Sequence, residues 1–369
     1  MNTRNMATLV ALLAGGCTVE VGSATDGGDV ETSVESADLD VVVARHCDGN
    51  NQLANNVPVA DATGVFTTVS AHGSIDLNNE FFQDLGTNGR RCVSCHVPTV
   101  GWTVTPHQLK AVFDATDGGK FDDGLGLSAV FRTVDGSNSP TADVSTLGKR
   151  RQAYSMLLNK GVIRIGLPIP ANAEFELVAV DDPYHFASAA ELSLFRRPLP
   201  TTNLKFDSTV MWDGREVVPG QTVAFDLLNQ ANDATLTHAQ GQPLTAAQRQ
   251  SIVDFETALA SAQITDRQAG DLHAAGANGG PEAILAQPFH IGINDNFGDS
   301  LTGAPFNPVV FNVFDAWTNI QSSHGHGHDD DDRYGHGHDR DDHGHGDHDD
   351  NTATDEARRS IARGQAVRG

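Results

Sequence analysis

The sequence is poor in cysteine, with 4 residues among 369, and poor in basic residues, with 24 lysines and arginines against 48 acidic residues. Its formal net charge of -24 argues against nucleic-acid binding, because a phosphate backbone is bound by a basic surface. The same acidity favours a soluble, exported protein, for which simple solubility is a better explanation of the charge than basic redox partners. The apolar run at residues 7–13 is too short to span a bilayer.

One pair of cysteines, Cys92 and Cys95, has the C-x-x-C spacing. The chain has no second such pair to complete a four-cysteine zinc ribbon. No βαβ pattern surrounds the pair as in a thioredoxin-like dithiol, so both sites are disfavoured. His96 follows directly, and C-x-x-C-H is the attachment signature of haem c. If these residues form a helical turn, both thiols and the imidazole share one face. The sequence therefore predicts one covalent haem with His96 as its proximal iron ligand.

The N-terminus predicts export. Residues 1–17 combine Arg4, the apolar run and small residues before Cys17, which is the pattern of a lipoprotein signal. We expect a periplasmic protein or outer-membrane lipoprotein of a Gram-negative bacterium, held at the membrane by a lipid on Cys17. The alternative is ordinary signal cleavage, which leaves Cys17 as a thiol that could pair with Cys47.

Composition then divides the chain. Residues 18–45 are rich in acidic and small polar residues and contain no lysine, which predicts a disordered acidic tether. Residues 46–320 carry enough apolar, phenylalanine-rich sequence to bury a core, and we expect them to form the haem domain.

Helical patterns dominate the expected domain. They occur at residues 79–85, at 151–159 and, after a capping-box start, at 245–262. Residues 162–165 and 174–180 flank a proline-rich turn and predict a hairpin. We therefore expect a mainly α, cytochrome c-like fold with a small β-hairpin insert.

A His/Asp-rich segment, residues 321–351, has a composition that predicts a disordered linker. Imidazoles beside carboxylates suit Zn, Ni or Cu, so loose binding of divalent metals is one interpretation and incidental linker histidines are the other. The weak metal-ligand candidates are His324, His326, His328, His336 and His338.

Residues 81–103 resemble the first haem segment of bacterial di-haem cytochrome c peroxidases and their methylamine-utilisation relatives. The N-S-P-T turn at 138–141 and the M-W-D-G-R segment at 211–215 follow in the order of that family. The helix at 245–262 resembles its connector, and residues 352–369 resemble the start of its second haem domain. The chain has no second C-x-x-C-H, so the electron-accepting haem of the family is absent from it. A truncated gene and a single-haem descendant are both open explanations.

The resemblance implies a haem that meets peroxide and receives electrons from a donor. Gln230 aligns with a distal glutamine of the family, whereas Gln240 stands where the family has a distal glutamate. Glutamine cannot exchange protons as a carboxylate does, and the nearby His238 is expected to substitute. His238, Gln230 and Trp212 are therefore the expected catalytic residues.

The sixth ligand of the iron decides between electron transfer and peroxide activation. His107 and His238 are the candidates for this distal position, and Met156 is more consistent with a core position. Trp102 and Trp212 are expected to pack near the haem.

Arginines near these segments are candidates for pairing with the haem propionates, on charge and position alone. They are Arg90, Arg91 and Arg215.

The function expected from these features is that of an exported c-type cytochrome that transfers electrons, with peroxide reduction as an extension. Its partners would be an electron-donor cytochrome or small redox protein and hydrogen peroxide. The alternative is a non-catalytic surface lipoprotein that binds haem and buffers divalent metals.

Overall fold

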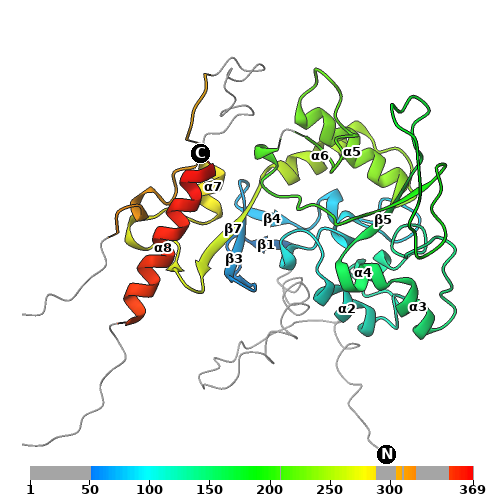
Figure 1. The fold of residues 1–369 in the computed structure, drawn as a ribbon, viewed down its shortest axis with the longest axis horizontal. Helices are drawn as coiled ribbons and strands as arrows, with labels where there is room; N and C mark the ends of the chain where they lie inside the picture. The colour runs from blue at the N-terminus through cyan, green and yellow to red at the C-terminus, as the bar shows by residue number, and fades with distance from the viewer. Residues whose placement is uncertain (1–50, 208, 288–304, 310, 321–348, 369) are drawn as a thin grey trace, which may run out of the picture. The chain divides into compact units, whose positions relative to one another are not determined.

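The computed structural model describes residues 51–207, 209–287, 305–309, 311–320 and 349–368 (Figure 1). The described chain divides into two compact units. Unit 1 consists mainly of residues 72–202 and 209–258, and unit 2 of residues 56–71 and the described residues after 258. The boundary at residue 258 thus falls inside the range that the sequence suggested as one haem domain. The expected signal, tether and His/Asp-rich segment lie outside the described residues, apart from the last few positions of that segment.

Unit 1 contains most of the helices. They are α2 (Pro106–Ala115), α3 (Leu147–Ala153), α4 (Ser155–Lys160), α5 (Val223–Thr237) and α6 (Ala246–Thr257), with the 3-10 helices η2 (Glu80–Phe82), η3 (Cys92–Ser94), η4 (Pro98–Val100) and η5 (Leu127–Val130). Its strands form two antiparallel pairs, β1 (Gln52–Ala54) with β4 (Ser74–Asp76) and β5 (Ile163–Leu167) with β6 (Leu192–Arg196). Helices α5 and α6 lie side by side (Figure 1).

Threonine begins four of these helices, and each cap is visible in the sequence. In each case the threonine side chain accepts the N–H of the residue three positions later, which satisfies one of the free donors of the first turn. The caps are Thr105, Thr146, Thr222 and Thr245. Helix α4 ends at Gly161, whose φ of 63° is the left-handed conformation common at helix C-termini.

Aromatic rings form the core of unit 1. The ring centre of Phe81 lies 5.9 Å from that of Trp102 and 5.1 Å from that of Phe255. Phe82 packs on Phe255 at 5.4 Å in an edge-to-face arrangement. These buried residues come from η2, from the loop after the C-x-x-C-H motif and from α6, so the core joins the motif to α6.

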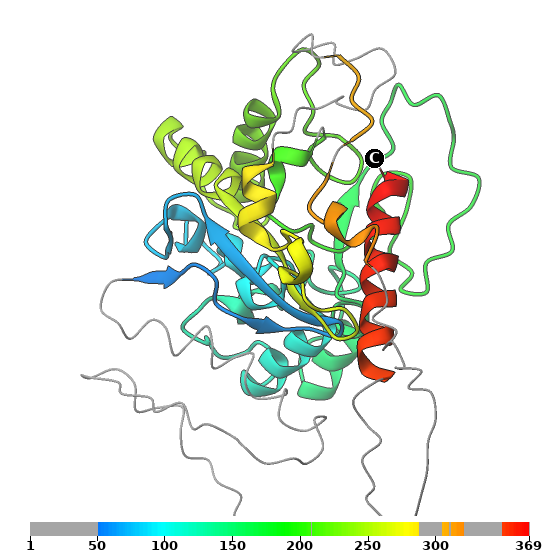
Figure 2. The same ribbon diagram turned by 90° about the vertical axis from the view of Figure 1, so that its left-hand side faces the viewer.

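Unit 2 is a four-stranded antiparallel sheet with two helices. The strand order is β2 (Val59–Ala60), β3 (Gly64–Ser70), β7 (Leu259–Asp266) and β8 (Gly270–Asp271), and the helices are α7 (Pro281–Ala286) and α8 (Asp349–Arg368). Helix α8, red in Figure 2, runs beside the orange 3-10 helix η8 (Asp315–Trp317).

The interior of unit 2 explains this packing of α8. Trp317 is buried, and the guanidinium of Arg358 lies 5.5 Å from its ring centre. Arg358 Nε also donates to the carbonyl of Ala269 at 3.0 Å. Residues 352–368, which were expected to begin another domain, therefore lie within α8 and help to cover the core of unit 2. Among the described helices, none combines the length and apolarity that crossing a bilayer requires.

The expectation of a mainly α fold is wrong. Seven α-helices share the described residues with eight strands in three small sheets, so the fold is mixed. One cause is that the helix expected at 245–262 ends at Thr257 and the chain continues as strand β7. Strand β7 pairs with β3 along its length, and this distant pairing overrides the helical periodicity.

The strand expected at 174–180 is also absent. Strand β5 pairs instead with β6, with Ile163 opposite Arg196. All residues of the expected strand are exposed, and Val178 is 90% exposed. The buried side chain of Arg164 selects the observed partner, because its guanidinium reaches Glu191 Oε1 at 2.9 Å directly before β6. The helix expected at 79–85 is shortened to the single turn of η2.

Candidate functional site

The C-x-x-C-H motif forms one tightly wound turn. The N–H groups of Cys95 and His96 both donate to the carbonyl of Cys92, at 3.1 and 3.0 Å. Ser94 Oγ donates to the carbonyl of Gly126 at 2.6 Å, which fixes the turn against the loop before η5. Both thiols are half-buried and neither forms a disulfide. The turn therefore presents two thiols and one imidazole within five residues.

A short loop after the motif orients His96. Gly101 and Trp102 both have left-handed conformations, with φ of 74° and 60°, and they turn the chain back so that Val97 pairs with Thr103. The Trp102 carbonyl is thereby brought to 3.3 Å from His96 Nδ1. A backbone carbonyl at Nδ1 is the partner that fixes the tautomer of metal-binding histidines, with the proton on Nδ1 and the lone pair on Nε2.

Burial keeps His96 neutral. It lowers the pKa of the imidazole to about 4, while hydrogen bonds to the backbone of Trp102 and of Leu199 oppose this shift. The backbone of Leu199 is therefore a second polar neighbour of the His96 ring.

The two thiols are held in their protonated form. Burial raises the pKa of Cys92, and the nearby carboxyl of Glu256 raises it further. Burial raises the pKa of Cys95 to about 11, although the charge of Arg90 opposes the shift. Redox dithiols have lowered thiol pKa values, so this environment differs from theirs.

Glu256 is a buried acid beside the motif. Its side chain comes from α6 and is 5% exposed, and burial raises its pKa to about 8. The carboxyl is therefore mainly protonated at neutral pH.

A cluster of three charged or titratable residues lies within electrostatic reach of Cys95 and His96. Asp135 Oδ2 accepts from His238 Nδ1 at 2.7 Å and forms a buried ion pair with Arg90 Nη1. Burial raises the pKa of Asp135, but the hydrogen bond from His238 and the charge of Arg90 outweigh it and hold the pKa below its usual range. The charge of His238 also lowers the pKa of His96, which places the two imidazoles within electrostatic reach.

The segment that leads into the motif holds the backbone around His238. Asn88 Nδ2 donates to the carbonyl of His238 at 2.8 Å, and Thr87 N donates to that of Ala239 at 3.0 Å. Gly86 permits this close approach, because a Cβ there would lie 1.9 Å from the carbonyl oxygen of Ala239. The motif and the end of α5 are therefore one structural assembly.

The structure brings some of the predicted residues together and separates others. His238 and Trp102 lie at the motif, as described above. Gln230 is half-buried on α5, two turns before His238. His107 is exposed at the start of α2.

Trp212 and Arg215 lie in an exposed segment. Trp212 is 61% exposed, and its indole N–H donates to the carbonyl of Arg197 at 3.1 Å. Arg197 precedes Leu199, the neighbour of His96, by two residues. Arg215 Nη1 pairs with Asp213 Oδ1 at 2.9 Å.

The arginines expected to bind propionates have other partners. Arg90 Nε and Nη2 donate to the carbonyls of Ala129 and Val130, at 2.9 and 3.1 Å, and its Nη1 is taken by Asp135. Arg90 is therefore committed to protein acceptors. Arg91 has a buried Nε that finds no hydrogen-bond partner in the described part of the chain.

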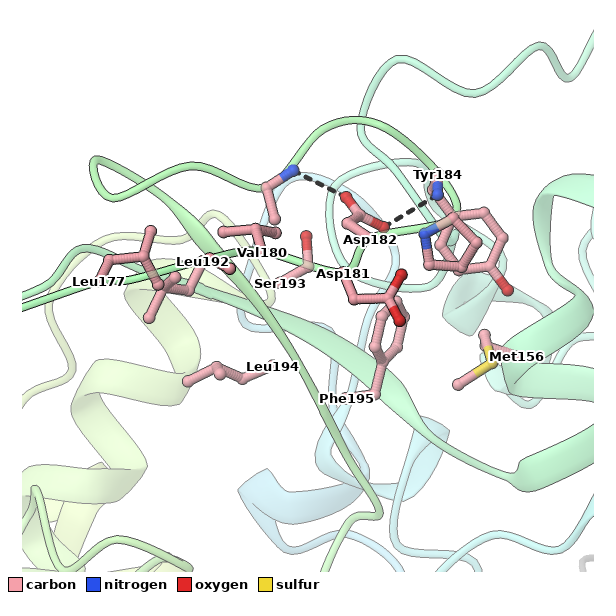
Figure 3. A pocket seen from close by; sticks show the side chains of 13 residues that line it. Met156, Leu177, Val180, Asp181, Asp182, Tyr184, Leu192, Ser193, Leu194 and Phe195 are labelled. Carbon is pink, nitrogen blue, oxygen red and sulfur yellow. Dashed lines mark hydrogen bonds between the residues drawn. The ribbon is translucent and has the colours of Figure 1, made fainter.

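A pocket of about 320 Å³ lies beside β6 (Figure 3). Mainly apolar side chains from segment 177–187 and from β6 line it, together with Met156 from α4. The carboxylate of Asp182 shapes its rim by accepting the N–H groups of Tyr184 and Ala187, at 2.9 and 2.7 Å. No motif residue lines the pocket, so it is not the attachment site.

Across the described residues, no group of three or more His, Cys, Asp or Glu side chains is arranged to hold a metal ion. The histidines suggested as divalent-metal ligands lie outside those residues. An iron held mainly by a haem needs one protein imidazole, which His96 supplies.

The sequence interpretation missed Asp135. It lies 103 positions before His238 and belongs to none of the motifs, and nothing in its local sequence marks it as a partner of the histidine. Arg90 had been noticed only as a propionate candidate.

No family model, curated protein or solved structure matches this chain. Its function is therefore inferred from its own residues.

Proposed function

We propose that this chain is an exported c-type cytochrome that transfers electrons. Cys92 and Cys95 would hold one haem covalently, and His96 would be the proximal iron ligand. The observation that carries this proposal is the 3.3 Å approach of the Trp102 carbonyl to His96 Nδ1, on a turn that also presents both thiols. With the proton held on Nδ1, Nε2 would be the nitrogen that binds the metal.

The surroundings of the motif fit a haem better than the other C-x-x-C sites. Both thiols have raised pKa values, which disfavours a redox dithiol. The imidazole is neutral at pH 7, because burial lowers its pKa to about 4, and a neutral imidazole is the form that binds iron. The ring of Phe81 lies 6.2 Å from that of His96 and adds an apolar wall.

A bound haem supplies a one-electron redox centre. The protein residues would set its properties. His96 would bind the iron, the buried Phe81 and Trp102 would exclude water from its proximal side, and Glu256 would place a neutral acid near the Cys92 attachment. An uncharged carboxyl avoids the cost of burying a negative charge close to the haem.

Peroxide reduction is the second candidate activity. The observation that favours it is His238, a half-buried imidazole beside the motif whose Nδ1 is hydrogen-bonded to Asp135. A histidine held in this way keeps the lone pair of Nε2 available to accept a proton from a substrate. An electron-donor cytochrome or small redox protein would then be the required partner.

The test is covalent haem content after secretion from a host with the haem c maturation machinery. We expect the purified protein to retain one haem after denaturation and organic extraction, measured by its pyridine haemochrome spectrum. Changing both Cys92 and Cys95 to Ala should abolish retention, whereas the matched variant Cys47→Ala should keep it. A wild-type protein without extraction-resistant haem would overturn the proposal, and a reversible one-electron redox titration would support electron transfer.

A further inference from the structure

We propose that Asp135 is a positioning residue that orients His238, so that Nε2 of this imidazole becomes the second axial ligand of the haem. This inference rests on the proposed haem attachment at His96. It names the distal ligand of the same site and the carboxylate that holds it.

The hydrogen bond between His238 and Asp135 fixes which nitrogen is available. Nδ1 of His238 lies 2.7 Å from Asp135 Oδ2, and a carboxylate accepts a proton from its partner. The neutral imidazole therefore carries its proton on Nδ1 and its lone pair on Nε2. A carboxylate behind a histidine is the arrangement that orients metal-binding imidazoles and raises their basicity.

Asp135 can hold this orientation because it is itself fixed. Arg90 forms a buried ion pair with the same Oδ2 and is anchored by the carbonyls of Ala129 and Val130. The backbone of residue 135 is also fixed, since its carbonyl accepts the N–H of Arg164 at 2.7 Å. The acceptor for His238 is thus held by two independent parts of the chain.

Asp135 Oδ1 is buried and has no hydrogen-bond partner among the described residues. An unpaired buried acceptor costs stability. Both partners, Arg90 and His238, lie at Oδ2, so the carboxylate faces the histidine although its other oxygen stays unpaired.

His238 is placed at the motif by its backbone as well as by its side chain. Asn88 donates to the His238 carbonyl at 2.8 Å, only four residues before Cys92. The side chain of His238 is 35% exposed, so protein does not fully enclose the ring. The rival candidate, His107, is exposed on α2 and lies eleven residues beyond His96 in the chain.

The test uses the full, haem-loaded protein and the ferric spin state as its readout. Wild type should give a low-spin, six-coordinate electron paramagnetic resonance spectrum. His238→Ala should convert it to high spin, and added imidazole should restore low spin. His107→Ala is the matched control and should leave the spectrum unchanged.

Asp135→Asn tests the positioning role separately. Asparagine retains the size of aspartate but can donate to Nδ1 and so select the wrong tautomer. We expect covalent haem to remain, with a mixed-spin spectrum and half-conversion at an imidazole concentration about 10–100-fold lower than for wild type. Asp114→Asn, which removes an exposed carboxylate paired with Arg151, should behave as wild type.

The outcomes separate this inference from the proposed function. Wild type without covalent haem would sink both. Covalent haem with an unchanged spectrum in His238→Ala would overturn the inference alone, and a wild-type response of Asp135→Asn would remove the positioning role. If Asp135→Asn does not fold, wild type labelled with 15N-histidine tests the distal ligand instead. Electron–nuclear double resonance should then detect two axial imidazole nitrogens, and detection of a single one would refute the inference.

Discussion

His96 Nδ1 and the carbonyl oxygen of Trp102 lie 3.3 Å apart, on a loop that returns to its own start within seven residues. The Trp102 contact of the imidazole is therefore set locally, and the backbone of Leu199 adds a contact from a distant part of the chain. Two consecutive left-handed residues, Gly101 and Trp102, make this return possible. A substitution that strains that loop should therefore lower the free energy of unfolding of the protein.

The first prediction concerns Gly101→Ala. Gly101 has a φ of 74°, and a Cβ at this position would meet no atom within 4 Å, so backbone strain is the only cost. We expect the free energy of unfolding to fall by about 1 kcal/mol, measured by urea denaturation. The matched control is Gly148→Ala in α3, where the added Cβ also meets nothing within 4 Å and helix propensity should raise stability by about 0.5–1 kcal/mol. Equal effects of the two substitutions would contradict the strain argument.

The second prediction concerns the N-terminus of α6. Thr245 accepts the N–H of Gln248, and the side chain of Gln248 accepts the N–H of Thr245 in return, at 3.3 and 3.0 Å. Thr245→Ala should lower the free energy of unfolding by about 1 kcal/mol, because it removes the hydroxyl that accepts the Gln248 N–H. Thr245→Ser keeps the hydroxyl and should retain most of the stability. If Thr245→Ser lowers the free energy of unfolding as much as Thr245→Ala does, the methyl group of the threonine, rather than the cap, is responsible.

Features encoded by neighbouring residues could be predicted from the sequence. The capping box at Thr245, the helix stop at Gly161 and the turn of the C-x-x-C-H motif are all present in the structure. Each depends on residues within four positions of one another, so the local sequence contains the whole cause.

Features that depend on distant partners could not be predicted in this way. The helical periodicity of residues 252–262 does not reveal that β3 will pair with Leu259–Asp266 and convert them to a strand. Likewise, the apolar alternation at 174–180 is a good strand pattern without a partner, because β5 is taken by β6. The pairing of Asp135 with His238 joins two residues whose own segments predict nothing about each other.

The third prediction assigns the N-S-P-T turn a structural role. Asn138 is buried, its Nδ2 donates to Ser155 Oγ at 2.8 Å, and its Oδ1 accepts the N–H of Met156 at 3.1 Å. Asn138→Ala leaves these groups without partners and should cost about 3 kcal/mol of unfolding free energy. Asn159→Ala, at an exposed position of α4, should change stability by less than about 0.5 kcal/mol. Similar losses in both variants would argue against this role.

The last prediction is a pH dependence caused by Glu256. Burial raises the pKa of this carboxyl to about 8, from an ordinary value of 4.5. Between these pH values the folded chain binds a proton that the unfolded chain has released, so stability falls as pH rises, by at most about 1.4 kcal/mol per pH unit. His96 acts in the opposite direction below pH 6.5, because its pKa is lowered to about 4 and the unfolded chain then binds the extra proton.

Comparing haem-free wild type with Glu256→Gln isolates the carboxyl, since the His96 contribution is present in both proteins and cancels in the difference. Glutamine is neutral at every pH, so its stability advantage over wild type should grow from pH 4.5 to pH 8 and then level off, in urea denaturation at fixed ionic strength. The exposed Asp254 on the same helix supplies the control, because Asp254→Asn should give a difference that does not vary over this range. If the curves of Glu256→Gln and wild type run parallel, Glu256 ionises normally, and a neutral acid cannot be part of the environment of Cys92.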